Sequence, residues 1–589
     1  MRARDPYIDL FRRYVAPQWR GTALLGALIV GSMGLQLVGP QLLRTFIDSA
    51  IGGAAIETLA TLALAFVGVA VVTHVLIAWS TYVGEDLGWT ATNALRADLA
   101  LHLLRLDLTF HKARTAGELI ERVDGDVTAL ATFFSRFVVN VFGNLLLLIG
   151  ILVVVAREDL RAGLALTLFA LVAVLVMAGP LRNIAAKRWQ RVREVSAQMY
   201  GFLGERLAGT EDIRSSGAET HVMNGLTFHH RAWLAARRRA IYAGTVLWST
   251  TIVLFAVGSA IAFGVGAYLW SLGAITLGTV YLLFHYTDML RRPIEQFRRE
   301  LEELQRAIAS VGRVTELLRT ETRLSEGRGV PIPRGPLTVE LDGVSFAYEE
   351  SEKEPDVVLH DLSLRLAPGE VLGILGRTGS GKTTLARLLL RFYDPTAGAI
   401  RIGGVDLREA RLDDVRSRAT LVSQDVQLFH ARVRENVTFF DPTIDDDRIT
   451  SVLERIGLGG WLRALPRTSG KDGALDSEML AGGLSAGEAQ LLAFARVFLR
   501  DPGLVILDEA SSRLDPATER HIERAIDALL ADRTGIVIAH RLATVQRCDR
   551  ILILEEGRIV EEGPRAALAQ DTSSRFSELL RTGLEQVLV

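Results

Sequence analysis

Residues 371–387 read Val-Leu-Gly-Ile-Leu-Gly-Arg-Thr-Gly-Ser-Gly-Lys-Thr-Thr-Leu-Ala-Arg, and this stretch decides the fold of the C-terminal half. A short apolar strand at 371–375 runs into a glycine-rich turn, after which a helix is expected to begin. Glycines in such a turn let backbone N–H groups converge on phosphate oxygens, and the start of the helix adds favourable partial charge. The spacing predicts a phosphate-binding loop made of Gly376, Arg377, Thr378, Gly379, Ser380, Gly381, Lys382, Thr383 and Thr384.

A second apolar strand is predicted at 504–507, and it ends in two carboxylates, Asp508 and Glu509. An apolar strand that delivers two carboxylates is typical of nucleoside triphosphate hydrolysis when a phosphate-binding loop precedes it. We expect Lys382 to reach the β- and γ-phosphates and the Thr383 hydroxyl to ligate Mg²⁺. Asp508 is then expected to hold Mg²⁺, and Glu509 to polarise the attacking water.

Long runs without Asp, Glu, Lys or Arg occupy the first half of the chain, at 21–43, 58–84, 137–156, 162–181 and 240–287. A helix needs about 20 apolar residues to cross a bilayer, so each run is long enough for one span and the last for two. A buried helix in a large soluble core would explain one such run but not all of them. We therefore expect six membrane spans, joined to a soluble part that carries most of the charge.

The placement of arginine predicts the orientation of these spans. The segment before the first run carries five arginines, whereas 49–56 and 271–276 carry no charge. By the positive-inside rule, both termini and the two long charged connections, 85–136 and 182–239, are expected in the cytosol. Apolar residues recur at helical spacing in both connections, which predicts helices that extend the spans and close in short turns near 106–114 and 207–216.

Charge and cysteine content exclude several classes of protein. The chain has 66 basic and 68 acidic side chains, a net charge of −2, whereas a protein that coats nucleic acid needs a large positive excess. Cys548 is the single cysteine, so neither an intrachain disulfide nor a cysteine-based metal cluster can form. Only five of the basic residues are lysines, and this arginine preference indicates a bacterial source.

A change in composition divides the chain into two domains and a linker. We expect a transmembrane domain over 1–317 with six spans and two cytosolic helical extensions, and a linker rich in proline and glycine over 318–336. From 337 to 589, short β-rich runs alternate with helical stretches, which is typical of a soluble α/β domain.

With these features in this order, the chain resembles an ABC transporter of the exporter type, a half-transporter with fused membrane and nucleotide-binding domains. The resemblance covers nearly the whole chain. It implies an all-α, six-helix transmembrane domain fused to an α/β P-loop NTPase domain that binds ATP and Mg²⁺. In the membrane half, 117–119, 126–127 and 209–213 resemble the sequences around the family's two coupling helices.

The resemblance also implies roles for further residues. Tyr348 matches the aromatic residue that stacks on adenine, and Asp515 matches the D-loop aspartate. Gln424 matches the glutamine that contacts Mg²⁺ and the attacking water, and His540 the histidine that hydrogen-bonds the γ-phosphate. The implied catalytic residues are Glu509, His540 and Gln424, and the implied Mg²⁺ ligands are Thr383, Gln424 and Asp508.

One motif departs from the family pattern. The signature Leu-Ser-Gly-Gly-Gln, which caps the ATP of the opposite subunit, is here Leu484, Ser485, Ala486, Gly487 and Glu488. Ala486 places a methyl group where the backbone approaches phosphate, and Glu488 places an anion near a polyanionic ligand. A complete set of Walker residues with a modified signature favours a heterodimer with a different half-transporter. A homodimer that tolerates the two substitutions is the alternative.

These features predict an ATP-driven exporter of hydrophobic or amphipathic small molecules, lipids or peptides, working by alternating access. An importer on the same fold, as for siderophores, and an ATP-gated channel or regulatory protein are the alternatives. Polar or aromatic side chains in the last span are candidates for contact with cargo: Tyr281, His285, Tyr286 and Asp288. We expect a multi-pass protein of a bacterial plasma membrane, in contact with lipid, with a cytoplasmic ATPase domain and no nucleic-acid partner.

Overall fold

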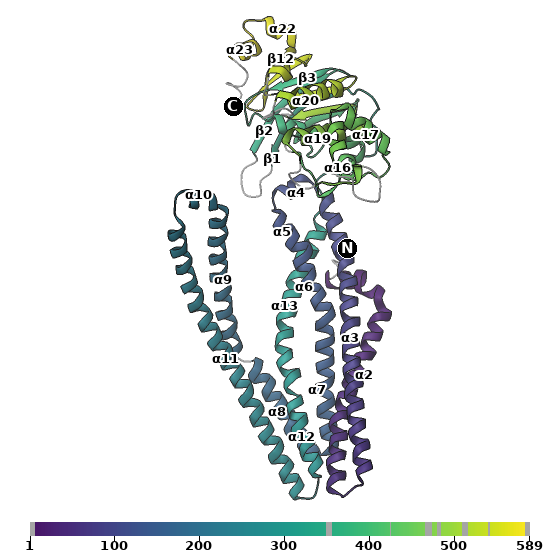
Figure 1. Ribbon diagram of the computed structural model, residues 1–589, viewed down its shortest axis with the longest axis vertical. Helices are drawn as coiled ribbons and strands as arrows, with labels where there is room; N and C mark the ends of the chain where they lie inside the picture. The colour runs from purple at the N-terminus through teal and green to yellow at the C-terminus, as the bar shows by residue number, and fades with distance from the viewer. Residues whose placement is uncertain are drawn as a thin grey trace. The chain divides into compact units, whose positions relative to one another are not determined.

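The computed structural model of the chain describes residues 6–178, 180–348, 356–423, 426–465, 474–479, 484–508, 516–539 and 542–582. The chain forms two compact units, each with its own core. The first comprises Met1–Leu104 and Ala116–Thr320, and the second comprises Arg105–Thr115 and Glu321–Val589. The first unit is helical, and the β-strands, drawn as arrows in Figure 1, belong to the second.

The first unit is built from eight long helices and several short ones within its described residues. The long helices are α2 (Trp19–Ile51), α3 (Ile56–Arg105), α7 (Val138–Glu158), α8 (Leu160–Ala178), α9 (Pro180–Ala208), α11 (Glu219–Ser271), α12 (Leu277–Met289) and α13 (Arg291–Arg319). The short helical segments are α1 (Pro6–Leu10), η1 (Phe11–Val15), η2 (Ala16–Gln18), α5 (Ala116–Ile120), η3 (Glu121–Asp126), α6 (Val127–Thr132), η4 (Phe133–Phe137) and α10 (Thr210–Ser215). The helices α9 and α11 form a long pair connected by α10 (Figure 1).

Five helical segments among the described residues are long and apolar enough to cross a membrane. They are Ile8–Ile51, Ile56–Arg105, Ala116–Glu158, Leu160–Met177 and Glu219–Ser271. The expected count of six is not confirmed. The residues expected to form the sixth span lie on α12, whose 13 residues are fewer than the roughly 20 that a bilayer requires. The helix that follows, α13, opens with two arginines and adds no apolar length.

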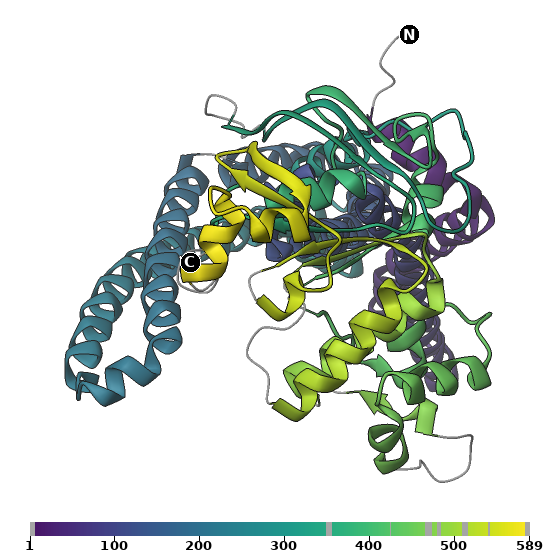
Figure 2. The same cartoon turned by 90° about the horizontal axis from the view of Figure 1, so that it is seen from above.

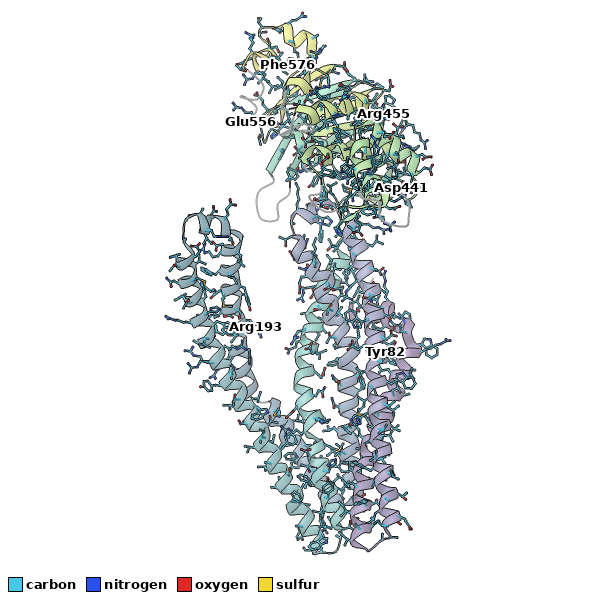
Figure 3. The ribbon with its side chains drawn as sticks, viewed as in Figure 1. Tyr82, Arg193, Asp441, Arg455, Glu556 and Phe576 are labelled. Carbon is cyan, nitrogen blue, oxygen red and sulfur yellow. The ribbon has the colours of Figure 1, made fainter. Side chains whose placement is uncertain are left out.

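The core of the first unit joins α7, α8, α11 and α12. Ile151, Ala173 and Leu282 are completely buried in it. Gly258 of α11 allows the close approach of α8, because a Cβ at this position would collide with the ring of Phe169. Large apolar side chains also stand on the outer surface of the helices, among them Tyr82 of α3 (Figure 3). This distribution suits helices whose outer faces contact lipid.

A buried carboxylate braces the charged extensions of this unit. Asp126, at the end of η3, accepts hydrogen bonds from the Ser310 hydroxyl (2.9 Å) and the Arg313 guanidinium of α13. The Asp126 side chain is 6% exposed and the Arg313 side chain 45% exposed, so the ion pair reaches from the interior to the surface. The hydrogen bonds that the guanidinium donates to the Asp126 carboxylate raise the pKa of Arg313 and keep it charged.

The second unit contains a six-stranded sheet with the order β12-β11-β3-β10-β9-β6. Its strands are β3 (Val371–Leu375), β6 (Ala419–Val422), β9 (Leu504–Asp508), β10 (Thr534–Ile538), β11 (Arg550–Glu555) and β12 (Arg558–Pro564). The strands β3, β6, β9, β10 and β11 are parallel to one another, and β12 pairs with β11 in the antiparallel direction. The strands β3 and β10 are buried along their whole length, as expected for a parallel sheet covered on both faces.

A second sheet, with the order β2-β1-β4-β5, is antiparallel. Its strands are β1 (Val339–Tyr348), β2 (Asp356–Leu366), β4 (Ala397–Ile402) and β5 (Val405–Asp406), and a two-stranded sheet pairs β7 (Ala431–Arg432) with β8 (Glu478–Met479). The helices are α4 (Leu108–Lys112), α14 (Lys382–Leu389), α15 (Leu412–Arg418), α16 (Val433–Thr438), α17 (Asp446–Arg455), α18 (Gly459–Ala464), η5 (Ala474–Asp476), α19 (Ala486–Arg500), α20 (Pro516–Leu530), α21 (Leu542–Val545), α22 (Arg565–Gln570) and α23 (Arg575–Thr582). Figure 2 shows helices of this unit beside the strands.

Candidate functional site

The glycine-rich loop follows β3 directly and leads into α14, whose first residue is Lys382. Gly381 has a φ of +102°, and a Cβ there would lie 2.5 Å from Cδ2 of Leu359. A Cβ at Gly376 would collide with the carbonyl oxygen of Leu554. The loop therefore requires glycine at both positions, where L side chains would strain the backbone or clash.

Two polar side chains of the loop are buried and converge on its interior. The Lys382 ammonium group donates to the carbonyl oxygens of Gly376 (2.6 Å) and Arg377 (2.9 Å). The Ser380 hydroxyl is buried and has no hydrogen-bond partner within the part of the chain that the structure describes. An orphaned buried hydroxyl is costly unless a ligand satisfies it. The donor set of the loop therefore fits a phosphate group.

The two described residues that are expected to hold Mg²⁺ lie next to each other. The Thr383 hydroxyl, on the first turn of α14, donates to Oδ2 of Asp508 (3.3 Å), which ends β9. These oxygen donors suit Mg²⁺, which commonly takes one or two protein ligands together with substrate phosphates. No cluster of three or more His, Cys, Asp or Glu that could hold a metal occurs among the described residues.

Three further expected site residues and the D-loop aspartate lie outside the described residues: Gln424, Glu509, His540 and Asp515. The strands that precede the first three are described. In the sheet, Val422 pairs with Leu507, and Ile538 pairs with both Asp508 and Ile374. The C-terminal ends of β6, β9, β10 and β3 therefore share one edge, which is where ligands bind in parallel α/β sheets.

Tyr348, expected to stack on adenine, ends β1 and lies near the loop. Its hydroxyl forms a hydrogen bond with Oγ1 of Thr384 (3.1 Å), and Arg387 donates to the same hydroxyl (3.4 Å). Both partners belong to α14. The aromatic ring and the phosphate-binding loop are thus positioned by the same helix.

The signature segment has an arrangement that the sequence reasoning missed. Ser485 is the N-cap of α19, and its N–H (2.9 Å) and hydroxyl (2.8 Å) both donate to Oε2 of Glu488. The Glu488 N–H returns a longer bond to the Ser485 hydroxyl (3.3 Å), which completes a capping box. The Ser-x-x-Glu spacing before an apolar run could have revealed it. Leu484 is half-buried, Ala486 is exposed and Gly487 is buried at the helix start.

The two expected turns of the long connections are short helices. The helix α4 lies within 106–114 and α10 within 207–216. Asp107 is the N-cap of α4, and its carboxylate accepts from the N–H groups of Phe110 (3.1 Å) and Arg323 (2.7 Å). Burial acts to raise the pKa of Asp107, but the bonds from Arg323 and Phe110 outweigh it and lower the pKa.

The four candidate cargo residues do not share one environment. Tyr286 is fully buried and its hydroxyl donates to the carbonyl oxygen of Leu37 (2.8 Å), so it is a packing residue. Asp288 is exposed, and Tyr281 and His285 are half-buried with stacked rings 5.9 Å apart. These three lie along one face of α12.

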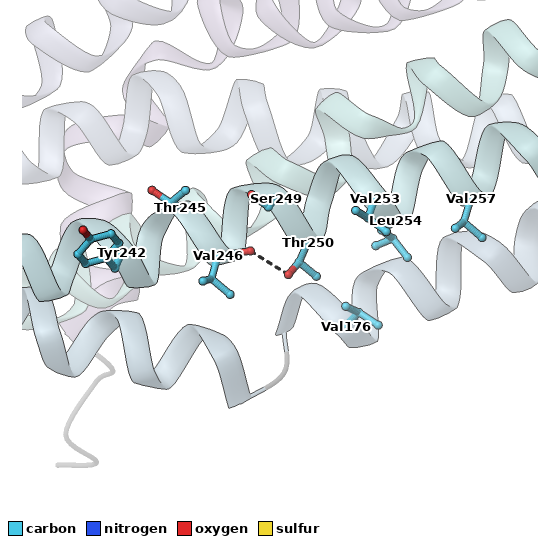
Figure 4. Close-up of a pocket in the computed structure, with 9 residues that line it drawn as sticks. All are labelled: Val176, Tyr242, Thr245, Val246, Ser249, Thr250, Val253, Leu254 and Val257. Atoms are coloured by element: carbon cyan, nitrogen blue, oxygen red, sulfur yellow. Dashed lines mark hydrogen bonds between the residues drawn. The ribbon is translucent and has the colours of Figure 1, made fainter.

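An open surface cavity of about 550 Å³ lies along α11, with Val176 of α8 at its side (Figure 4). It is lined by Val176, Tyr242, Thr245, Val246, Ser249, Thr250, Val253, Leu254 and Val257. The Thr250 hydroxyl donates to the carbonyl oxygen of Val246 (2.9 Å), so this polar group is satisfied within α11. The volume is in the range of small-molecule sites, and the lining is mostly apolar.

Comparisons with known proteins give matches to both units of the chain. Family models of the ABC transporter transmembrane region and of the ABC transporter match residues 22–294 and 359–512. A putative multidrug export ATP-binding/permease protein of Staphylococcus aureus is 30% identical over 92% of this chain and 95% of its own length. YknV of Bacillus subtilis, an uncharacterized ABC transporter ATP-binding protein, is 29% identical over 95% of this chain and 90% of its own.

A solved structure, that of a bacterial Atm1-family ABC exporter with ATP bound, superimposes with a TM-score of 0.78. It is 25% identical in sequence, and the match covers 96% of this chain and 98% of that one. Both the helical unit and the sheet-containing unit therefore have counterparts in one exporter chain.

Proposed function

Because the chain belongs to the ABC transporter family and is an ATP-hydrolysing exporter, we propose that it binds Mg·ATP at the loop 376–384 and couples its hydrolysis to alternating access. The observation that carries this proposal is the pairing of Thr383 with Asp508 beside a loop whose buried Ser380 hydroxyl has no hydrogen-bond partner among the described residues. Bound Mg²⁺ would neutralise the charge that develops between the β- and γ-phosphates.

The remaining roles follow the family pattern. We assign adenine stacking to Tyr348, and phosphate binding to the loop backbone and Lys382. The Mg²⁺ ligands are Thr383, Gln424 and Asp508, the catalytic residues are Glu509, His540 and Gln424, and Asp515 belongs to the D-loop. Glu509→Gln should nearly abolish the ATPase activity of the purified transporter, and retention of half the activity would reject the assignment.

The domain boundaries remain 1–317, 318–336 and 337–589 in this proposal. We place both termini and the ATPase domain in the cytoplasm of a bacterium, on the evidence of arginine placement. The chain itself is a multi-pass membrane protein. A protease added outside intact cells should leave the C-terminal domain uncut if this orientation holds. Cleavage in that domain would show that it faces the outside.

A second half-transporter is needed to complete the ATP site, and we propose that it is a different chain. The support is chemical: the Ser485 N–H and hydroxyl, which the family presents to the partner's γ-phosphate, are already bonded to Glu488. Such a site should bind ATP weakly and hydrolyse it slowly. Mass measurement of the complex purified from native membrane decides the question, because two copies of this chain would establish the homodimer.

For cargo we propose hydrophobic or amphipathic small molecules, including lipid-like ones. The open, apolar cavity of about 550 Å³ along α11 supports this class. Relatives described as multidrug exporters favour export over the import alternative. ATP-dependent uptake of an amphipathic dye into inside-out vesicles would support the proposal, and ATP-dependent loss of dye from them would instead show import.

A further inference from the structure

The short helix α4 is attached to the ATP-binding unit, although in sequence it lies between helices of the membrane unit. The Asp107 carboxylate, which caps α4, accepts the N–H of Arg323 at 2.7 Å. Leu108 packs against the hydrophobic core that contains β1 and β3. The position of α4 within this unit is therefore fixed by both a charged cap and apolar contact.

The last residue of α4 lies against the aromatic ring expected to bind adenine. Nζ of Lys112 is 4.5 Å from the ring centroid of Tyr348 and 5.6 Å from that of Tyr393. A cation within about 6 Å of a ring centroid is attracted by the negative face of the ring. Lys112 thus contacts the aromatic ring of Tyr348 itself.

Other contacts hold the same ring from its edge and its hydroxyl. Phe346 and Tyr393 approach Tyr348 in T-shaped arrangements, with centroids 4.9 and 5.4 Å away. The hydroxyl is bonded to Thr384 of α14. With Lys112 over the ring, the plane of Tyr348 is fixed relative to the phosphate-binding loop before any nucleotide arrives.

We propose that Lys112 is a positioning residue for adenine recognition, acting through Tyr348. An aromatic side chain that is already ordered loses less conformational entropy when a base stacks on it, so its affinity for the base is higher. The inference rests on the proposed stacking role of Tyr348. By reciprocity, the base should also stabilise α4, which connects α3 to α5 along the chain.

The experiment compares Lys112→Met, which keeps the aliphatic stem, with Lys112→Arg, which keeps the cation. Affinities of the full-length protein are measured for MgATP and, separately, for magnesium tripolyphosphate, which has no base. We expect Lys112→Met to weaken ATP binding by about twofold to thirtyfold, which corresponds to the energy range of cation–π contacts. The effect should appear in KM and not in kcat. Lys112→Arg should restore affinity, and tripolyphosphate binding should not change. The exposed Lys187→Met is the matched control.

A double-mutant cycle with Tyr348→Ala separates this inference from the proposed function. Lys112→Met should add no loss in the Tyr348→Ala background, and ATP should slow amide exchange in α4 only when Lys112 is present. If Tyr348→Ala weakens ATP binding but Lys112→Met does not, the inference about Lys112 fails while the adenine role of Tyr348 stands. If Tyr348→Ala weakens ATP binding no more than it weakens tripolyphosphate binding, the proposed adenine role of Tyr348 itself is wrong. Equal losses for both ligands in Lys112→Met would show direct phosphate binding and overturn the proposal.

Discussion

Glu488→Gln should tighten ATP binding at the site that the signature segment completes. In the structure, the Glu488 carboxylate accepts both donors of Ser485 that a γ-phosphate would need. Ser485 must break its bonds to this carboxylate before it can donate to ATP. Glutamine restores the family's residue and removes the negative charge while keeping one acceptor oxygen, so the competing bonds become weaker.

The size of the effect follows from hydrogen-bond energies. A bond to a charged group contributes about 1.5–3 kcal/mol and a neutral one about 0.5–1.5 kcal/mol. Because Ser485 is exposed, we take the lower difference of about 1 kcal/mol, which corresponds to roughly fivefold in affinity. Loss of a glutamate from the first turn of α19 should also cost the helix about 0.3–1 kcal/mol.

The assay measures MgATP binding to the full-length transporter in the hydrolysis-deficient Glu509→Gln background, with and without Glu488→Gln. Glu435→Gln is the matched control, because Glu435 likewise accepts the N–H of its helix N-cap, Arg432 (2.8 Å), on α16. We expect both variants to lose similar stability but only Glu488→Gln to bind ATP more tightly. Unchanged or weaker ATP binding in Glu488→Gln, or equal tightening in Glu435→Gln, would refute the competition between carboxylate and phosphate.

Other predictions follow from single residues. Gly381→Ala should weaken ATP binding and lower the melting temperature, because a φ of +102° costs an L residue about 1–2 kcal/mol and the added Cβ would collide with Leu359. Gly379→Ala is the control: its φ is +84° but the space around it is open, so its melting temperature and ATP binding should fall less. The lowered pKa of Asp107 means that its stabilisation of α4 is complete above its unfolded pKa and is lost as pH falls through the folded value. The protection of the α4 amides, measured relative to the exchange rate of an unstructured peptide at the same pH, should therefore fall only below about pH 4, and Asp107→Asn should abolish this pH dependence. Burial raises the pKa of the Cys548 thiol to about 12, so maleimide should label it only after unfolding, as mass spectrometry would show.

Sequence spacing was enough to predict the features that depend on local chain geometry. The strand, loop and helix around Lys382 form a continuous pattern of apolar and glycine residues, and the structure has β3 and α14 there. The family and the exporter activity were inferred from the resemblance of several such motifs to ABC exporters, and both are confirmed. Such signals are contained in a dozen neighbouring residues, so no long-range packing is needed to interpret them.

Features that depend on packing were harder to predict. Tyr286 and Tyr281 lie on the same helix and were both predicted to contact cargo, but the Tyr286 hydroxyl donates its hydrogen bond to a backbone carbonyl of α2. The uncharged run 240–287 was expected to hold two spans with a break at 271–274, and α11 does end at Ser271 while α12 begins at Leu277. The break was thus predicted, but the 13 residues of α12 leave the sixth span a prediction.

The segment 105–115 belongs to the second compact unit, although in sequence it lies between helices of the first. Its neighbours in sequence are membrane-unit helices, so an estimate that averages over neighbours assigns it to them. Its own side chains are a helix-capping carboxylate, an apolar leucine and a lysine, and each finds its partner in the ATP-binding unit: Arg323, the sheet core and Tyr348. Because these partners are more than 200 residues away in the chain, only the fold brings them together. A nucleotide-binding unit that incorporates a piece of its neighbour's chain has a covalent route by which changes at Tyr348 can reach α3 and α5.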